Sequence, residues 1–246
     1  MVLNKVFNFT KDSENKGSMS LKGNEKKAEL YFYGDIVSDN WKNYGWAYDD
    51  DKCPKDIIDF FADLEDTAEL DVYINSGGGM VYAGLAIHNI IKRHSGKVTV
   101  HVDSLAASIA SIIALSGNEL VIPVSAQFMI HKPTVGAWGN ADDLRKEADY
   151  LDTCQETLLD IYMEHVKPGV TAETINEMIN AETWFTGKKA AEYFNVTVNT
   201  SSAPMNCAKS SYFKDYANTP TEVINSADSI DRAKERFQFE LELYSQ

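Results

Sequence analysis

The stretch DVYINSGGGMVYAGLAIHNIIKRHSGKVTVHVD, residues 71–103, shows the alternation that decides the fold. DVYINS is predicted to be a β-strand, GGG a turn, and MVYAGLAIHNIIKRH an amphipathic helix with regularly spaced apolar residues. KVTVHVD alternates valine with polar residues, which is typical of a second strand. Strand, helix and strand in this order predict a parallel βαβ unit with a right-handed crossover.

The same alternation continues on both sides of this unit. Before it, ELYFYGDIV is predicted to be a strand, and Pro54 opens a helix. After it come a short helix that ends at Gly117, the strands ELVIPV and AQFMIH, and a long helix from Asn140 to about residue 166. The long helix carries an apolar stripe, made of Leu144, Ala148, Leu151, Leu158 and Ile161. The sequence therefore predicts an α/β fold of repeated βαβ units, in which reactive groups collect at the carboxyl ends of the strands.

A chain of 246 residues suits one large α/β domain with tails. Residues 8–28 are polar and poor in apolar side chains, so we expect a flexible N-terminal segment over residues 1–28. SIDRAKERFQFELELYSQ has the pattern of an amphipathic helix beyond the core, which predicts an extension over residues 201–246. The core domain is therefore expected at residues 29–200.

The composition argues against several kinds of protein. The net charge of −14 disfavours a nucleic-acid partner, which needs clustered Lys and Arg. Cys53, Cys154 and Cys207 lack metal-ligand spacing, so free thiols in a reducing compartment are expected. The chain contains no continuous apolar run of about 18 residues, which predicts that it has no membrane span. Its first residues also lack an apolar signal segment, so a cytoplasmic protein is expected.

Ser108 lies in DSLAASIASIIALSG, residues 103–117, where a strand-like run gives way to a helix-like one. A serine hydroxyl is a weak nucleophile until a base takes its proton and two donors hold the oxyanion. At a helix start, Ser108 has the backbone N–H of Ile109 beside it, and the small Ala106 and Ala107 leave room for a substrate carbonyl. On this stretch alone, a helix cap or a packed small residue is the alternative.

His131 ends the apolar strand AQFMIH and precedes Lys132-Pro133, so its imidazole is expected at a strand tip. A lone histidine at such a position is more often structural, and that is the alternative interpretation. The other histidines lie on predicted helices or within a strand, and we interpret them as structural: His88, His94, His101 and His165.

The glycine turn in INSGGGMVYAG, residues 74–84, lets a backbone N–H point outward without a Cβ in the way. A phosphate cradle is the competing interpretation. A nucleotide-binding loop of that kind needs a Gly-Lys-Ser/Thr sequence, which is absent here. The turn is therefore better suited to holding an oxyanion.

INSGGGMVYAGLAI, DSLAASIASIIALSG and FMIHKP, in this order, resemble the three signature blocks of the ClpP family of serine peptidases. The resemblance covers about residues 29–195. It implies a ClpP/crotonase-like fold with a handle formed by a strand and a helix, and a peptidase that needs no cofactor or metal. It also implies that Ser108 is the nucleophile, that His131 is the general base, and that the backbone N–H groups of Gly79 and Ile109 form the oxyanion hole.

The third catalytic position departs from the family pattern. The family places an aspartate shortly before an aromatic residue and a Ser or Thr that opens the next helix. The matching segment here is NAETWFTGKKAAEYF, residues 180–194, and it puts Glu182 at that position. A glutamate can orient the imidazole if its backbone sits back by about one methylene. An exposed glutamate at a helix end is the alternative.

YGDIVSDNW, GNADDLRKEADYLD and AETWFTGKKAAEYF are similar to the phage and prophage branch of the family, the head maturation proteases. Cellular members typically carry proline where this chain has Gly77. This narrower resemblance implies scaffold or capsid proteins as substrates, within the assembling prohead in the cytoplasm of a bacterial host.

Two other functions stay open. One is a cellular-type ClpP subunit that works with an AAA+ unfoldase, and the other is a crotonase-like acyl-CoA enzyme. A serine nucleophile argues against the second, and an intact Ser–His pair argues against an inactive scaffold. The resemblance also implies a homo-oligomeric ring, a heptamer or tetradecamer, joined through KPTVGAWG (132–139) and the helix that follows it.

Overall fold

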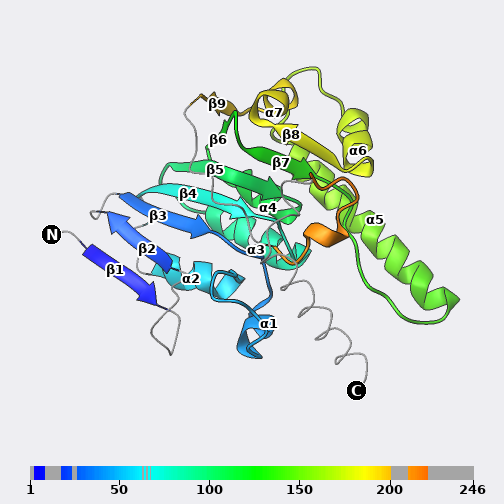
Figure 1. The fold of residues 1–246 in the computed structure, drawn as a ribbon, viewed down its shortest axis with the longest axis horizontal. Helices are drawn as coiled ribbons and strands as arrows, with labels where there is room; N and C mark the ends of the chain where they lie inside the picture. The colour runs from blue at the N-terminus through cyan, green and yellow to red at the C-terminus, as the bar shows by residue number, and fades with distance from the viewer. Residues whose placement is uncertain are drawn as a thin grey trace.

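The computed structural model describes residues 3–8, 18–23, 27–62, 64, 66, 68–200 and 210–220, the first two ranges as backbone only. Figure 1 shows a central sheet with helices packed on it and the long helix α5 projecting from one end. The mixed α/β architecture with a mainly parallel sheet confirms the predicted fold class.

Five strands of the central sheet run parallel in the order β3-β4-β5-β6-β9. They are β3 (Lys27–Phe32), β4 (Glu69–Ser76), β5 (Val98–Ala107), β6 (Glu119–Pro123) and β9 (Thr197–Asn199). Because these strands are parallel, their carboxyl ends meet at one edge of the sheet. This edge is where the sequence placed its candidate functional residues.

β5 has two partners on the same side. Its first half pairs with β6, and its last residues pair with β7 (Gln127–Ile130), again in parallel. β8 (Thr183–Thr186) then runs antiparallel to β7, with Ile130 opposite Thr183. The sheet therefore divides beyond the first half of β5, into a branch with β6 and a branch with β7. The pairing with β7 places the end of β5 beside the end of β7.

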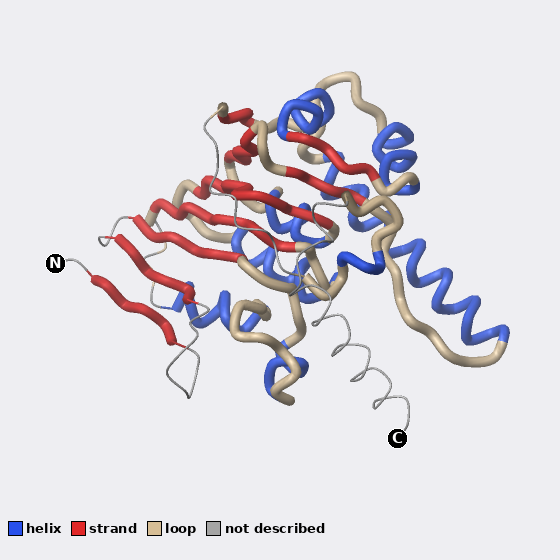
Figure 2. The backbone as a smooth tube through the Cα atoms, viewed as in Figure 1, coloured by secondary structure: helices blue, strands red, loops and turns tan. Residues whose placement is uncertain are grey.

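The helices of the described residues fall between and beyond these strands. They are α1 (Asp39–Asn43), α2 (Pro54–Ala62), α3 (Val81–Lys92), α4 (Ile109–Ala114), α5 (Ala141–Met163), α6 (Ala172–Asn180), α7 (Gly187–Tyr193) and the 3₁₀ helix η1 (Phe213–Asp215). α3 and α4 pack together against one face of the sheet (Figure 2). Every residue of α4 is buried, including Ser111, which is its single polar side chain.

The two faces of the sheet differ in burial. One face carries Leu30, Val72 and Val100, which are fully buried in the main core. The other face carries a ladder of half-buried rings, in which Tyr73 stacks on Tyr31 at 4.8 Å and on His101 at 4.9 Å. The alternation ends at the carboxyl ends of β4 and β5, where both faces are buried. Those ends are therefore covered by other parts of the chain.

Two predicted boundaries were wrong. The strand expected to end at Asp103 continues to Ala107, because its last residues gain β7 as a partner. The short helix was expected to end at Gly117 but ends at Ala114. The cause is Asn118, whose side chain accepts from the Val98 N–H at 2.7 Å and whose own N–H donates to the Val98 carbonyl at 2.8 Å. These bonds pull the chain back to the sheet.

α5 begins as predicted, with Asn140 as N-cap in a capping box. Its predicted apolar stripe, however, is buried only in the second half of the helix, where Cys154, Leu158 and Tyr162 face the core. Leu144, in the first half, is 46% exposed, because this half extends beyond the sheet (Figure 1). The sequence predicted the stripe but not which half of it packs on the domain.

The ends of the chain are described in part. β1 (Leu3–Asn8) and β2 (Ser18–Gly23) pair antiparallel within residues 1–28, the segment expected to be flexible. The amphipathic helix predicted over the last eighteen residues, 229–246, lies outside the described residues. The domain boundaries stay predictions.

Candidate active site

Ser108 is the residue between β5 and α4. Its φ of 56° and ψ of −129° form a backbone conformation that non-glycine residues rarely adopt. Its N–H donates to the Met129 carbonyl on β7 at 3.0 Å, and its carbonyl accepts from the Ser111 N–H at 2.9 Å and hydroxyl at 2.6 Å. Since the Ser111 hydroxyl is donating, the buried Tyr162 hydroxyl donates to it at 2.6 Å. β7 and α5 thus hold the strained turn in place.

His131 directly follows β7, and β7 pairs with the end of β5. This pairing brings His131 Nε2 to 2.7 Å from Ser108 Oγ, a hydrogen bond in which a neutral imidazole accepts. Burial lowers the pKa of His131 below its usual value, while the charge of Glu182 acts in the opposite direction. A lowered pKa keeps the imidazole neutral near pH 7, which is the form that takes a proton.

Glu182 directly precedes β8, and the β7–β8 register puts it opposite His131. Its carboxylate nevertheless turns to other donors: the Trp184 indole N–H at 3.2 Å, the Ala217 N–H at 2.7 Å and the Asn218 N–H at 2.6 Å. Among the described residues, Glu182 makes no hydrogen bond with His131. The structure therefore brings the predicted third residue beside the pair but does not join it to the imidazole.

The glycine turn passes directly behind Ser108. Gly78 and Gly79 have φ of 103° and 145°, respectively. A Cβ on Gly78 would lie 2.7 Å from the Ala107 carbonyl oxygen, and one on Gly79 would lie 2.1 Å from that of Ile36. Both positions therefore require glycine, because any side chain would force the turn away from Ser108.

The two predicted oxyanion donors lie in the glycine turn and at the start of α4, directly after Ser108. Gly79 and Ile36 form an isolated β-bridge, whose two hydrogen bonds come from neighbouring groups. The Ile36 N–H donates to the Gly78 carbonyl at 2.8 Å, and the Met80 N–H donates to the Ile36 carbonyl at 2.8 Å. These bonds leave the Gly79 N–H without an acceptor in the described part of the chain. The Ile109 N–H, at the start of α4, also has none there. Two backbone donors are thus available beside the hydroxyl, as an oxyanion hole requires.

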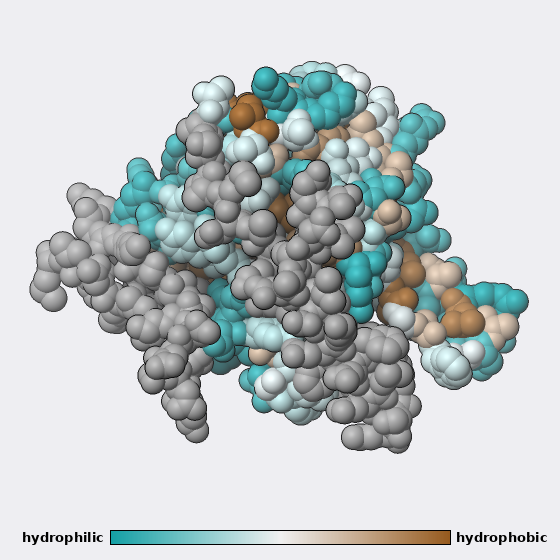
Figure 3. Space-filling view, in the orientation of Figure 1, coloured by the Kyte–Doolittle hydropathy of each residue, from teal (hydrophilic) through white to brown (hydrophobic). Residues whose placement is uncertain are grey.

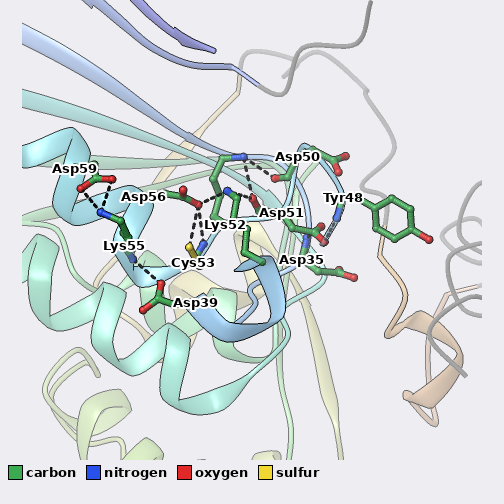
Figure 4. Close-up of polar contacts among 11 residues, drawn as sticks. Asp35, Asp39, Tyr48, Asp50, Asp51, Lys52, Cys53, Lys55, Asp56 and Asp59 are labelled. Atoms are coloured by element: carbon green, nitrogen blue, oxygen red, sulfur yellow. Dashed lines mark hydrogen bonds and ion pairs between the residues drawn. The ribbon is translucent and has the colours of Figure 1, made fainter. Parts of the chain in front are cut away.

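A polar network supports the loop that carries Ile36 (Figure 4). The Asp51 carboxylate accepts from the Asp35 N–H at 3.0 Å and the Tyr48 N–H at 2.9 Å, and Lys42 forms an ion pair with Asp56 at 2.6 Å. Burial lowers the pKa of the neighbouring Lys52. The network fixes the loop, which in turn fixes the glycine turn through Ile36.

Sequence reasoning missed two contributions to the site. The first is the support of Ser108 by Ser111 and Tyr162, for which a serine one helical turn after the nucleophile was the available signal. The second is residues 210–220, SSYFKDYANTP, whose Tyr216 ring lies 4.8 Å from the His131 ring, edge to face. This segment has no periodicity, and its aromatic residues were its only signal.

Metal-binding clusters, cysteines and membrane-spanning helices were also considered for the described residues. No group of three or more His, Cys, Asp or Glu side chains there could hold a metal ion. Cys53 and Cys154 are free and buried, and Cys207 lies outside the described residues. No helix in the same part of the chain is long and apolar enough to cross a bilayer.

The sheet is mainly parallel, and its carboxyl edge carries a hydrogen-bonded Ser–His pair and two available N–H donors. These features define a class of proteins, those with the geometry for nucleophilic attack on an acyl carbon. Comparison with known families narrows that class. A family model described as Clp protease matches residues 50–196. The match covers more than half of the chain, and the chain belongs to the Clp protease family.

Curated relatives agree with this assignment. The chain is 33% identical over 128 residues to ATP-dependent Clp protease proteolytic subunit 3 of Streptomyces coelicolor, covering 51% of this chain and 58% of the relative. It is 30% identical over 130 residues to proteolytic subunit 2 of Corynebacterium glutamicum, covering 52% and 63%. It is 35% identical over 125 residues to proteolytic subunit 1 of Chlamydia abortus, covering 49% and 64%. In each case the match spans less than two thirds of the relative.

Proposed function

We propose that this chain is a serine endopeptidase with Ser108 as nucleophile and His131 as general base. The observation that carries the proposal is the 2.7 Å contact between Ser108 Oγ and His131 Nε2, beside the available N–H groups of Gly79 and Ile109. Membership of the Clp protease family supports it.

The chemistry follows from this arrangement. His131 Nε2 takes the hydroxyl proton as Ser108 Oγ bonds to the carbonyl carbon of a peptide, and the N–H groups of Gly79 and Ile109 donate to the new oxyanion. The imidazolium then gives its proton to the leaving amine, which leaves an acyl-enzyme. A water molecule then bonds to the acyl carbon as His131 takes one of its protons. His131 returns this proton to Ser108 Oγ as the acid leaves. Glu182 stabilises the imidazolium once its carboxylate turns toward Nδ1.

A fluorophosphonate tests this proposal, because Ser108 Oγ would displace its fluoride and form a stable adduct. We expect mass spectrometry to find the adduct on Ser108 in the parent chain and to find none in His131→Ala. Turnover of a CoA thioester without any adduct on Ser108 would instead support the crotonase-like alternative.

We also propose that the chain assembles into a homo-oligomeric ring, a heptamer or tetradecamer. The projecting part of the molecule carries exposed hydrophobic side chains, with Val135 48%, Trp138 94% and Leu144 46% exposed (Figure 3). Such side chains favour contact with another copy. Sedimentation velocity should show a ring for the parent, and smaller species for Trp138→Glu combined with Leu144→Glu. Tyr44→Glu is the matched control, since Tyr44 is also exposed, at 68%, but lies elsewhere. A parent monomer with full activity at nanomolar concentration would contradict the ring.

For the substrates, we propose scaffold or capsid proteins of a phage head, cleaved in the bacterial cytoplasm or the assembling prohead. The head maturation motifs quoted from the sequence support this proposal. The names of the relatives favour a second candidate, a proteolytic subunit served by an AAA+ unfoldase. The two differ in ATP dependence. Cleavage of capsid proteins encoded beside this gene, without an ATPase, supports the first, whereas degradation of a folded substrate only with an AAA+ partner and ATP supports the second.

The domain division is part of the same proposal. Residues 29–200 form the peptidase domain, with residues 1–28 and 201–246 as appendages. Residues 210–220 of the second appendage pack on this domain.

A further inference from the structure

Residues 210–220, called here the cover segment, lie across the carboxyl edge of the sheet beside Ser108 (Figure 1). The side chain of Tyr216 is buried, with its ring 4.8 Å from the His131 ring and its hydroxyl donating to the Gly77 carbonyl at 2.5 Å. Burial raises the pKa of Tyr216 well above its usual value. Tyr216 therefore fills the space between the glycine turn and the Ser–His pair.

The cover segment also takes the carboxylate of Glu182. Both oxygens accept from its backbone, from the Ala217 N–H and the Asn218 N–H, and the Asn218 side chain donates to the Ala181 carbonyl at 3.1 Å. With its oxygens directed to these donors, the carboxylate makes no hydrogen bond with His131 among the described residues. One segment thus covers two members of the predicted triad and diverts the third.

The other end of the cover segment is anchored by buried polar contacts. The Ser211 N–H and hydroxyl both donate to one oxygen of Asp35, at 3.0 Å and 2.6 Å. Next to it, Ser210 lies so close to the glycine turn that a Cβ on Gly77 would lie 2.4 Å from the Ser210 Cβ and 2.8 Å from the Phe213 ring. Glycine at position 77 therefore makes room for the segment.

Between these ends, the cover segment packs on an apolar floor. Phe213 and Tyr216 form one buried cluster with Leu105, Ala107 and Met129, which belong to the strands on either side of Ser108. A peptide carbonyl must come within about 3–3.5 Å of the serine oxygen to be attacked. The backbone that carries such a carbonyl would pass through the volume that Tyr216 fills.

We infer that residues 210–220 are an intramolecular inhibitor, which must leave the carboxyl edge of the sheet before a peptide reaches Ser108. The inference rests on the proposed peptidase function. The opposite role is a permanent part that completes the active site by ordering Glu182. It predicts slower labelling for Tyr216→Ala and Gly77→Ala, the two variants that weaken the segment.

Two substitutions in the full-length chain weaken the cover segment from opposite sides. Tyr216→Ala removes the ring that covers the pair. Gly77→Ala adds a methyl group that collides with Ser210, and Gly77 has no positive φ that would strain an alanine. If the closed form limits access, both variants should react with a fluorophosphonate at Ser108 at least about tenfold faster than the parent, because apparent reactivity scales with the fraction of open molecules. Lys214→Ala, an exposed position on the same segment, is the matched control and should react at the parental rate.

A synthetic peptide of residues 210–220 gives a second readout. It should slow the labelling of the Tyr216→Ala protein, whereas the same peptide with alanine in place of its Tyr216 should not. If Tyr216→Ala fails to fold by circular dichroism, Gly77→Ala carries the test. Equal or faster labelling of the parent would overturn the inhibitor and leave the peptidase standing. Absence of any Ser108 adduct in parent and variants would overturn both.

Discussion

Ser108 and His131 are held by the backbone of two paired strands, whereas the Glu182 carboxylate is held by N–H groups 35 and 36 residues further along the chain. The first arrangement cannot change without breaking the sheet, because β5, β7 and α4 fix both residues. The second can change when one surface segment moves. The contrast teaches that the Ser–His pair is built into the sheet, while the proposed orienting carboxylate is held by a contact outside the sheet.

The largest expected effect tests the built-in pair. Ser108→Ala should lower peptide hydrolysis by about 10⁶-fold, because no other group forms the acyl-enzyme, and His131→Ala should cost nearly as much. Steady-state hydrolysis of a fluorogenic peptide measures both, with circular dichroism confirming the fold. Ser104→Ala, on the same strand, is the control and should keep parental activity. Comparable turnover by Ser108→Ala and parent would end the serine mechanism.

A smaller effect is expected at the releasable carboxylate. Glu182→Gln should lower kcat by about 10²–10⁴-fold, since the amide cannot stabilise the imidazolium in the open form. Glu182→Asp should also be less active, because its shorter side chain falls short of His131 from a backbone settled around glutamate. Glu177→Gln, an exposed residue of α6, serves as the control. If Glu182→Gln keeps parental kcat, the site is a Ser–His dyad and the position of the Glu182 carboxylate has no effect on catalysis.

The pH dependence of kcat/KM sharpens the same comparison. Hydrolysis needs neutral His131, so the rate falls as pH drops through its pKa, and burial places that midpoint below 6.5. The Glu182 charge acts to raise this pKa. Glu182→Gln should therefore move the acid limb to still lower pH while lowering the plateau. An unmoved limb would show that the carboxylate does not sense the imidazole.

The smallest effect concerns stability at the strained turn. Ser108→Gly should be more stable than Ser108→Ala by about 1 kcal/mol, because relief of a strain of about 1–3 kcal/mol outweighs an unfolded-chain entropy of about 0.4–1 kcal/mol. Urea unfolding of the two inactive variants measures the difference. At Ser104, in ordinary strand backbone, the order should reverse. Equal stability at position 108 would mean that the sheet does not force the conformation.

Local pattern was sufficient for much of the fold. Alternation predicted β4, α3 and β5, because each buries one face of a regular element, and Asn140 marked the start of α5 through its own capping bonds. Ser108 and His131 were predicted for a related reason. Each directly follows a strand, and parallel strands bring their ends together whatever the connecting loops do.

Features that depend on distant partners were not predictable in this way. The Tyr216 hydroxyl bonds to a carbonyl 139 residues away, and no periodicity in SSYFKDYANTP records that contact. The exposure of the first half of α5 was not predictable for the same reason, because an apolar stripe indicates a face that packs but not the surface on which it packs. Glu182 lies between these cases. Its place opposite His131 follows from the β7–β8 register, whereas the direction of its carboxylate does not.

The positive φ of Ser108 has a consequence for how such a chain evolves. At this position, selection for stability favours glycine and selection for hydrolysis favours serine, so the two pressures act in opposite directions on one codon. A lineage that is no longer selected for peptide hydrolysis would gain stability by replacing Ser108 with glycine. The reverse substitution would then be disfavoured, because serine brings back the backbone strain. On the proposed mechanism, Ser108 therefore supplies the attacking hydroxyl at the expense of backbone strain, and a glycine at this position would mark the loss of that chemistry.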